Sequence, residues 1–134
     1  MTRTIHVRRA YGTRVEGSAL VMREGFSPRY DLDRTTGIIS RIGHSVEGES
    51  LADRIVIIPT AKGGVAAGWA FFDILGKGYA PRALVFGKLN PVMVQGAVLA
   101  RITITEGWSE DPLALFRTGD QLVVDPGNRT IAFA

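Results

Sequence analysis

The sequence predicts a compact α/β domain with three layers, β/β/α, that spans residues 1–134 as a single unit. Three observations predict it: a continuously apolar run near the middle, two successive strand–loop–helix patterns around that run, and antiparallel segments towards both ends. Successive βα units favour parallel strands joined by right-handed crossovers. At 134 residues and 46% hydrophobic content, the chain can bury one core and is too short for two domains. No period of 20 to 50 residues repeats, which excludes a solenoid.

The first third is predicted to be β structure. Runs at 14–22, 37–41 and 54–58 are separated by Gly, Pro and Asp, which favour turns. Residues 33–37 read Asp-Arg-Thr-Thr-Gly and predict a turn, because glycine adopts positive φ freely. Residues 55–58 are all apolar, as in a strand covered on both faces, so they are predicted to belong to the central strand.

The first strand–helix unit follows this central strand. Pro59 is predicted to end the strand, and residues 62–64, Lys-Gly-Gly, to form a loop. Apolar side chains at i, i+4 and i+7 from residue 65 then predict one face of a helix that ends near Gly76 or Gly78.

The second unit begins with an apolar strand at 83–86. Asn90 is predicted to cap a helix with proline at its first position, and residues 102–105 return as a strand. At the end of the chain, residues 119–134 predict a β-hairpin with a Pro-Gly-Asn turn.

Composition excludes several classes of function. The chain has no cysteine, so its own thiolates hold neither disulfides nor an iron–sulfur cluster. His6 and His44 are its only histidines, and a metal site built wholly from this chain is therefore not expected. The net charge is +3, and most basic residues are scattered along the sequence, so no nucleic-acid partner is expected. Apolar runs stay well below the ~18 residues of a membrane span and no signal peptide opens the chain, which predicts a cytoplasmic protein without membrane association.

The segment 59–68 is the strongest candidate for chemistry. Glycines after a buried strand let backbone N–H groups at a helix N-terminus approach an anion, and Lys62 adds a positive charge for a carboxylate or phosphate. The alternative is a tight βα turn whose glycines satisfy backbone geometry alone, and the sequence favours neither interpretation. The segment lacks both the G-x-G-x-x-G pattern and a Gly-Lys pair followed by Ser or Thr, so no nucleotide cofactor is expected.

A second candidate group lies between residues 44 and 50. It contains the His44 imidazole, two carboxylates and two hydroxyls, one of them on Ser50, which could position a substrate or transfer a proton if they converge. The alternative, a solvated surface loop, is favoured because such residues more often cap turns.

In order and spacing, these segments resemble the small-subunit family of aconitase X, a domain related to the small subunits of phosphomevalonate dehydratase and of cis-3-hydroxy-L-proline dehydratase. The resemblance covers about residues 12–106, and its strongest part is the element 44–50 followed closely by a strand, proline and a glycine loop. The residues that carry it are Gly12 with 14–21, then 33–37, His44 with 48–50, the loop after Pro59, Ala80 with Pro81, and 90–97.

This resemblance implies a swivelling β/β/α domain like the mobile domain of aconitase. It implies a large partner subunit that holds a metal ion or an iron–sulfur cluster, and a hydro-lyase reaction that dehydrates a small hydroxylated carboxylate. The mechanism expected by analogy is removal of a proton beside the carboxylate while the partner's metal binds the leaving hydroxyl as a Lewis acid.

The loop departs from the family pattern, which commonly reads Pro-Ser-Gly-Arg-Gly followed by serines. Here the serine run is occupied by Gly64 and two apolar residues, whereas Thr60 stands at the first serine and Lys62 at the arginine. The resemblance therefore implies Thr60 and Lys62 as catalytic residues, with Gly63, Gly64, His44 and Ser50 binding the substrate. Thr60 would need activation by a neighbouring base, and a desolvated Lys62 could itself act as a base.

Two alternatives stay open beside a hydro-lyase small subunit that is inactive alone. One is a stand-alone module that binds a small carboxylate without chemistry. The other is a non-catalytic subunit that docks and orients a catalytic partner.

Overall fold

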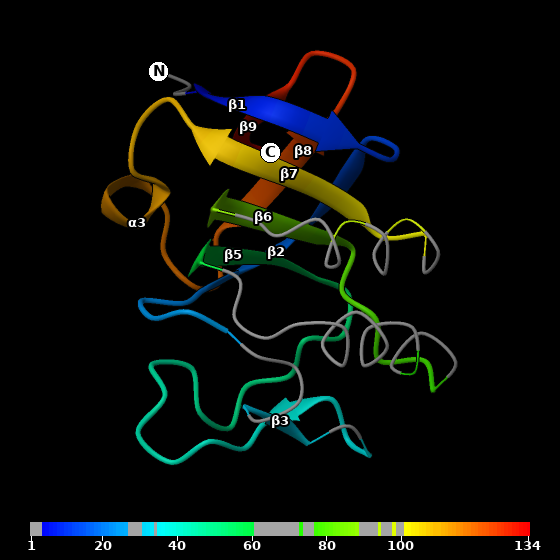
Figure 1. Cartoon of the computed structure of the whole chain (residues 1–134), viewed down its shortest axis with the longest axis vertical. Helices are drawn as coiled ribbons and strands as arrows, with labels where there is room; N and C mark the ends of the chain where they lie inside the picture. Colours follow the sequence, from blue (N-terminus) through cyan, green and yellow to red (C-terminus); the bar gives the residue numbers. More distant parts are fainter. Residues whose placement is uncertain are drawn as a thin grey trace.

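The computed structural model describes residues 4–26, 31–33, 35–60, 73, 77–88, 94, 98 and 101–134. Among these residues, seven strands close into a barrel in the order β1-β7-β6-β5-β2-β8-β9 (Figure 1). Their bounds are β1 Thr4–Tyr11, β2 Val15–Val21, β5 Arg54–Thr60, β6 Ala83–Lys88, β7 Thr103–Trp108, β8 Gln121–Asp125 and β9 Thr130–Phe133. A small sheet of β3 Leu32–Asp33 and β4 Ile38–Ile39 and the short helix α3 Pro112–Leu115 lie outside the barrel.

One wall of the barrel consists of the parallel strands β2, β5, β6 and β7. In register, Ala19 lies beside Ile55, Ile55 beside Ala83, and Ala83 beside Thr103. Parallel neighbours cannot be joined by tight hairpins. The predicted parallel arrangement of the strands in the middle of the chain is therefore confirmed.

The antiparallel strands β8, β9 and β1 close the barrel. Val124 of β8 lies opposite Ile131 of β9, and the hairpin predicted near the end of the chain is observed. Ile5 of β1 also faces Ile131, while Val7 faces Trp108 of β7. β1 thus joins the hairpin to the last parallel strand.

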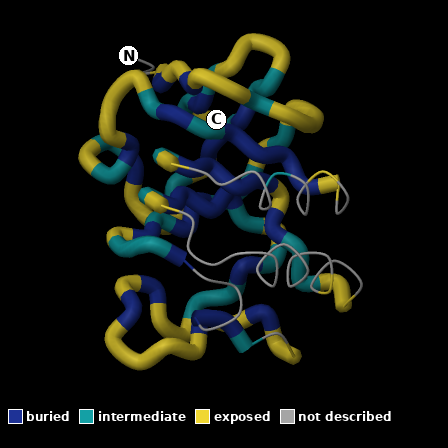
Figure 2. Tube along the Cα trace, viewed as in Figure 1, coloured by how far each residue is buried: buried dark blue, intermediate teal, exposed yellow. Residues whose placement is uncertain are grey.

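The parallel wall separates two apolar cores. Ile55 and Ile57 pack inside the barrel with Val85, Leu122 and other residues, whereas Val56 and Ile58 pack on its outer face with Leu84 and Phe86. Figure 2 shows this buried band across the middle of the molecule. The central run is thus covered on both faces, as predicted. The antiparallel strands, the parallel strands and an outer layer form the three layers of the α/β fold.

We call residues 31–33 and 35–52 of the outer layer the lobe. It contributes Leu32, Ile39, Val46 and Leu51 to the outer core. The predicted turn at 33–37 is observed, since the N–H of Gly37 donates to the Asp33 carbonyl at 2.8 Å.

Some elements differ from the sequence prediction. β1 was not predicted, although Ile5 and Val7 alternate with exposed residues along it. β5 continues through Pro59, which has no N–H, because Thr60 beyond it still pairs with Lys88 of β6. Of the predicted strand 37–41 the structure forms only β4. The predicted helices lie largely outside the described residues, within which positions 73, 94 and 98 are helical.

Candidate functional site

The carboxyl ends of the four parallel strands meet at one edge of the barrel. Their last residues are Val21, Thr60, Lys88 and Trp108. Figure 1 shows the arrowheads of β5, β6 and β7 on the same side. In sheets with parallel strands, ligands commonly bind outside the carboxyl ends, so this edge is where a site is expected.

Thr60 lies at the end of β5 with an exposed side chain. Its carbonyl accepts a hydrogen bond of 3.1 Å from the N–H of Phe26, which follows β2. The neighbouring strand end is tightly packed, because a Cβ on Gly87 would lie 2.7 Å from the Pro59 carbonyl oxygen and 3.1 Å from the Trp108 ring. Thr60 is therefore presented from a rigid strand end, and residues 62–64, the predicted Lys62, Gly63 and Gly64, lie outside the described residues.

The structure buries His44, whose side chain has no exposed surface. Its Nδ1 lies 3.3 Å from the N–H of Val46 and 3.4 Å from a carboxylate oxygen of Glu24. One nitrogen cannot accept from the first and donate to the second at once. We assign the neutral tautomer with Nδ1 accepting from Val46, because a backbone N–H is always a donor. Among the described residues, Nε2 has no hydrogen-bond partner.

Glu24 is the residue that sequence reasoning missed. The hydroxyl of Ser45 donates to its Oε1, and the N–H of Ser45 donates to its Oε2 at 3.2 Å. Partial burial alone would raise the pKa of Glu24. The hydrogen bonds from Ser45 and from the backbone outweigh burial and hold the pKa of Glu24 below its ordinary value of 4.5. No spacing in the sequence links Glu24 to a partner 21 residues away.

The rest of the predicted 44–50 group does not converge with this cluster. Glu47 accepts a hydrogen bond of 3.1 Å from the N–H of Gly43 within the same loop. Glu49 faces Arg54 at 3.8 Å. Ser50 is half-buried and accepts from the N–H of Ala52 at 3.1 Å, as a turn-capping residue does.

Ser50 and Thr60 also lie towards opposite ends of β5. Ser50 comes four residues before the strand begins, and Thr60 ends it. A seven-residue strand spans about 20 Å, so the two side chains do not share one small-molecule site within the described residues. The direct binding of substrate by His44 and Ser50 stays a prediction.

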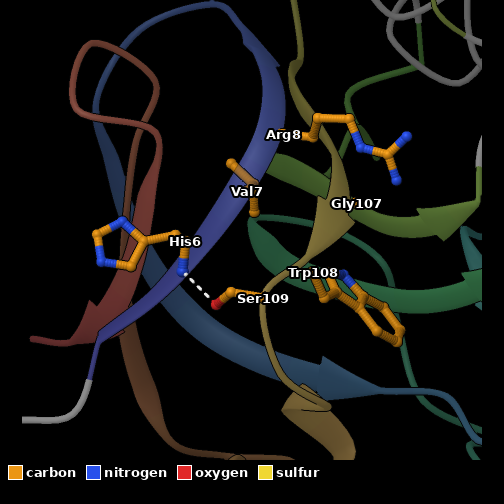
Figure 3. Close-up of a pocket in the computed structure, with 6 residues that line it drawn as sticks. All are labelled: His6, Val7, Arg8, Gly107, Trp108 and Ser109. Atoms are coloured by element: carbon orange, nitrogen blue, oxygen red, sulfur yellow. Dashed lines mark hydrogen bonds between the residues drawn. The ribbon is translucent and has the colours of Figure 1, made fainter.

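Two depressions lie near the carboxyl edge. The smaller one, of about 270 Å³, is bounded by β1 and the end of β7. Figure 3 shows the Arg8 side chain and the Trp108 indole on one side and the His6 imidazole pointing away on the other. The hydroxyl of Ser109 accepts from the N–H of His6 at 3.0 Å. These groups do not converge on a common point.

The larger depression, of about 480 Å³, lies between the end of β2, residues 45 and 46, and the segment from α3 to residue 118. Arg23 and Arg117 line it together with the hydroxyls of Ser45 and Thr118. We call it the Arg23–Arg117 groove. It neighbours the Glu24 cluster, because Ser45 belongs to both.

Within the described part of the chain, no three His, Asp or Glu side chains gather as metal ligands would. A metal ion or an iron–sulfur cluster does not fit the residues that are present there, and the sequence supplies no cysteine. The same residues include no helix that is long and apolar enough to span a membrane.

Comparison with known proteins relates the fold to enzyme subunits. The phosphomevalonate dehydratase small subunit of Archaeoglobus fulgidus is 33% identical over 112 residues, which is 84% of each chain. That of Methanothrix thermoacetophila is 31% identical over 121 residues, covering 90% of this chain and 88% of the relative. The holo-form crystal structure of Thermococcus kodakaraensis aconitase X superposes with a TM-score of 0.90 at 23% identity, covering 98% of each chain, which shows a shared fold.

The family described as the aconitase X swivel domain matches residues 4–133, nearly the whole chain. The resemblance predicted from residues 12–106 is thus confirmed, and it extends over β1 and the terminal hairpin. The chain belongs to the aconitase X swivel domain family.

Proposed function

We propose that this chain is the small subunit of an aconitase X type hydro-lyase. Together with a large subunit it would dehydrate a small hydroxylated carboxylate. The observation that carries the proposal is the family membership over residues 4–133, together with relatives named as dehydratase small subunits. The exposed Thr60 at the carboxyl edge supports the proposal, because its hydroxyl is a reactive group at the edge where a substrate is expected to bind.

Thr60 and Lys62 are proposed as the catalytic residues of this chain. A neighbouring base first takes the proton of the Thr60 hydroxyl, and the resulting Thr60 alkoxide then takes the proton from the carbon beside the carboxylate and becomes a hydroxyl again. Lys62 faces the carboxylate as a positive charge, and the N–H groups of Gly63 and Gly64 donate to it. The proton and the hydroxyl that leave neighbouring carbons are together one water molecule.

Metal chemistry belongs to the large subunit in this proposal. We assign a metal ion or an iron–sulfur cluster to that partner, because this sequence contains no cysteine and its described residues form no ligand group. Such a group would bind the leaving hydroxyl as a Lewis acid. A cytoplasmic location stays a prediction of the sequence.

The structure supports a positioning role for His44. His44 and Ser45 contact Glu24, and Phe26, two residues further along the chain, hydrogen-bonds to Thr60. The cluster therefore holds the segment beside the proposed catalytic residue. The alternative role of His44 and Ser50 is direct binding of substrate. It is tested by measuring the turnover of the complex described below with His44→Ala or Ser50→Ala.

Co-expression with the large subunit tests the proposal. We expect a stable complex that dehydrates one of a panel of hydroxy acids. Thr60→Ala should lower turnover by about 100-fold or more, and Thr60→Ser should retain most of it because serine offers the same hydroxyl. Lys62→Arg, which keeps the charge, is the matched control for Lys62→Ala.

Each alternative function has its own outcome. Unchanged turnover of an intact complex with Thr60→Ala and Lys62→Ala would show a docking subunit instead. Failure of any complex to form, combined with a rise in the melting temperature of the isolated chain with one carboxylate, would show a stand-alone binding module.

A further inference from the structure

The Arg23–Arg117 groove has a shape suited to a small ligand. Its volume of about 480 Å³ lies within the range of about 300–1,000 Å³ that small-molecule pockets occupy. Its apolar surface comes from Val21, Val46, Leu113 and Phe116. Val46 belongs to the outer core and Phe116 to the barrel core, so the groove opens at the seam between the two.

Hydrogen bonds fix the walls of the groove. The N–H of Val21 donates to the Thr118 hydroxyl oxygen at 3.0 Å, which ties β2 to the segment after α3. The N–H of Arg23 donates to the Ser45 hydroxyl oxygen at 3.1 Å, which ties the end of β2 to the lobe. Figure 1 shows α3 and the loop after β2 on the same side of the barrel. The groove is therefore largely formed before any ligand arrives.

The two arginines of the groove have no carboxylate partner in the part of the chain that the structure describes. Neither Arg23 nor Arg117 forms an ion pair with a carboxylate of the described residues. The nearby carboxylates have other partners: Glu24 accepts from Ser45, and Asp120 accepts from the backbone N–H of Arg117 at 2.8 Å. These carboxylates reduce the net charge of the region, but within the described part of the chain they form no ion pair with either guanidinium group.

The remaining donor is the hydroxyl of Thr118. Its oxygen accepts from Val21, and its hydrogen stays available to a ligand. The Ser45 hydroxyl differs, because it accepts from Arg23 and donates to Glu24. Two arginines and one hydroxyl thus line the groove together with apolar side chains, a set that matches an oxyanion attached to an apolar chain.

We propose that the Arg23–Arg117 groove binds a small organic anion, a phosphate or carboxylate carried on a short apolar chain. Arg23, Arg117 and Thr118 donate hydrogen bonds to its oxygens, and Val21, Leu113 and Phe116 contact its chain. This site goes beyond the proposed function: it uses none of Thr60, Lys62, Gly63 or Gly64, and it requires no large subunit.

Titration of the full chain with butyl phosphate, followed by ¹H–¹⁵N NMR at low ionic strength, tests the site. Low salt is chosen because exposed charges are screened by ions. We expect saturable shifts of the amides of Arg23, Ser45 and residues 113–118, with weaker binding of inorganic phosphate and none of butanol. Pentanoate in place of butyl phosphate distinguishes a carboxylate ligand from a phosphate.

Arg23→Gln and Arg117→Gln should each weaken butyl phosphate binding about tenfold, the loss of roughly one charge-assisted interaction. Arg9→Gln is the matched control, since Arg9 is an exposed arginine on β1, outside the groove. Equal melting temperatures of all three variants would show that folding is intact. The proposal is overturned if butyl phosphate and pentanoate both bind more weakly than about 10 mM, or if Arg9→Gln weakens binding as much as the groove variants do. Neither result would bear on Thr60 or on the large subunit.

Discussion

The parallel wall of the barrel and the lobe are stabilised by different forces. In the wall, Val56 and Ile57 are fully buried on opposite faces, and both apolar cores include its strands. Such burial contributes about 25 cal/mol for each Å² of apolar surface removed from water, without regard to direction. The wall therefore depends on the period and size of its side chains.

The lobe depends on particular polar contacts and backbone angles. Asp31 is completely buried, and its carboxylate accepts from Arg41 at 3.0 Å. Gly37 has φ of +74°, and Tyr79 lies so close that a Cβ on residue 37 would come within 2.7 Å of the Tyr79 Cβ. Glu24 attaches the lobe to the end of β2 through Ser45. Single substitutions can therefore disrupt the lobe without removing much apolar surface.

This difference has a functional consequence. The wall carries Thr60 on a rigid strand, while the lobe carries His44 and Ser45, which reach the neighbouring segment through Glu24. Apolar packing thus fixes the strand that carries Thr60, and polar contacts align the segment that lies beside Thr60. Four substitutions separate these contributions.

The largest loss is expected from Phe86→Ala in the parallel wall. Phe86 is completely buried in the outer core, and truncation leaves a cavity that costs about 4 kcal/mol of unfolding free energy. Phe133→Ala is the matched control, because Phe133 is 36% exposed and its truncation should cost only about 1–2 kcal/mol. Guanidinium unfolding curves measure both, and equal losses would contradict the stated role of the buried wall.

Asp31→Asn in the lobe should cost about 3 kcal/mol, because Arg41 loses its charged partner and a buried acceptor is changed. Asp53→Asn provides the comparison: its side chain is 80% exposed and 4.0 Å from Arg82, so the cost should stay below about 0.5 kcal/mol. The same unfolding curves apply. If the two variants lose the same stability, buried polar contacts do not control the lobe.

Gly37→Ala should cost about 2–3 kcal/mol, since the new Cβ would lie 2.7 Å from the Cβ of Tyr79 at a positive φ. Gly48→Ala isolates the backbone contribution: Gly48 also has positive φ, +86°, but open space around it, and should cost about 1 kcal/mol. The difference in unfolding free energy between the variants measures the contact with Tyr79. Equal unfolding free energies of the two variants would show that the contact with Tyr79 adds nothing to the cost.

The smallest effect is expected from Glu24→Gln, and it depends on pH. The folded-state pKa of Glu24 lies below 4.5, so its carboxylate stabilises the fold above pH 4.5, and this contribution disappears as pH falls through the folded-state pKa. Because the side chain is 37% exposed, screening limits the effect to below about 0.5 kcal/mol. As the pH is lowered from 7 to 3, the melting temperature should fall less steeply for Glu24→Gln than for the unaltered chain. A parallel fall would show that Glu24 contributes nothing specific.

The sequence predicted the wall better than the lobe or the first strand. The uninterrupted apolar run at 55–58 indicates burial on both faces of the strand, because a strand with one solvated face would alternate apolar and polar residues. β1 was missed because only Ile5 and Val7 alternate with exposed residues along it, which is too short a pattern to indicate a strand. Its pairing with β7 and β9 is a contact between distant segments, which local patterns do not encode.

The candidate site also contains some features that the sequence predicted and others that it did not. Thr60 was found from the position of a loop after a buried strand, together with a family resemblance, and the structure places it at the carboxyl edge. The Glu24–Ser45 contact and the Arg23–Arg117 groove were not found, because each joins residues at least 21 positions apart. Ser50 was grouped with His44 by proximity in sequence, yet it caps a turn before β5 begins.

The sequence by itself therefore determined the parallel strands, the terminal hairpin, the family and the exposed residue at the end of the central strand. The strands and the hairpin follow from short-range periodicity and from turn residues, whose physical preferences act within a few positions. The family and the position of Thr60 follow from a resemblance in the order and spacing of segments. Only the tertiary structure decided that the sheet closes through β1, that His44 is buried beside Glu24, and that two arginines share a groove. Those facts arise when segments far apart in the chain meet, and the energy of such contacts depends on geometry that no local pattern contains.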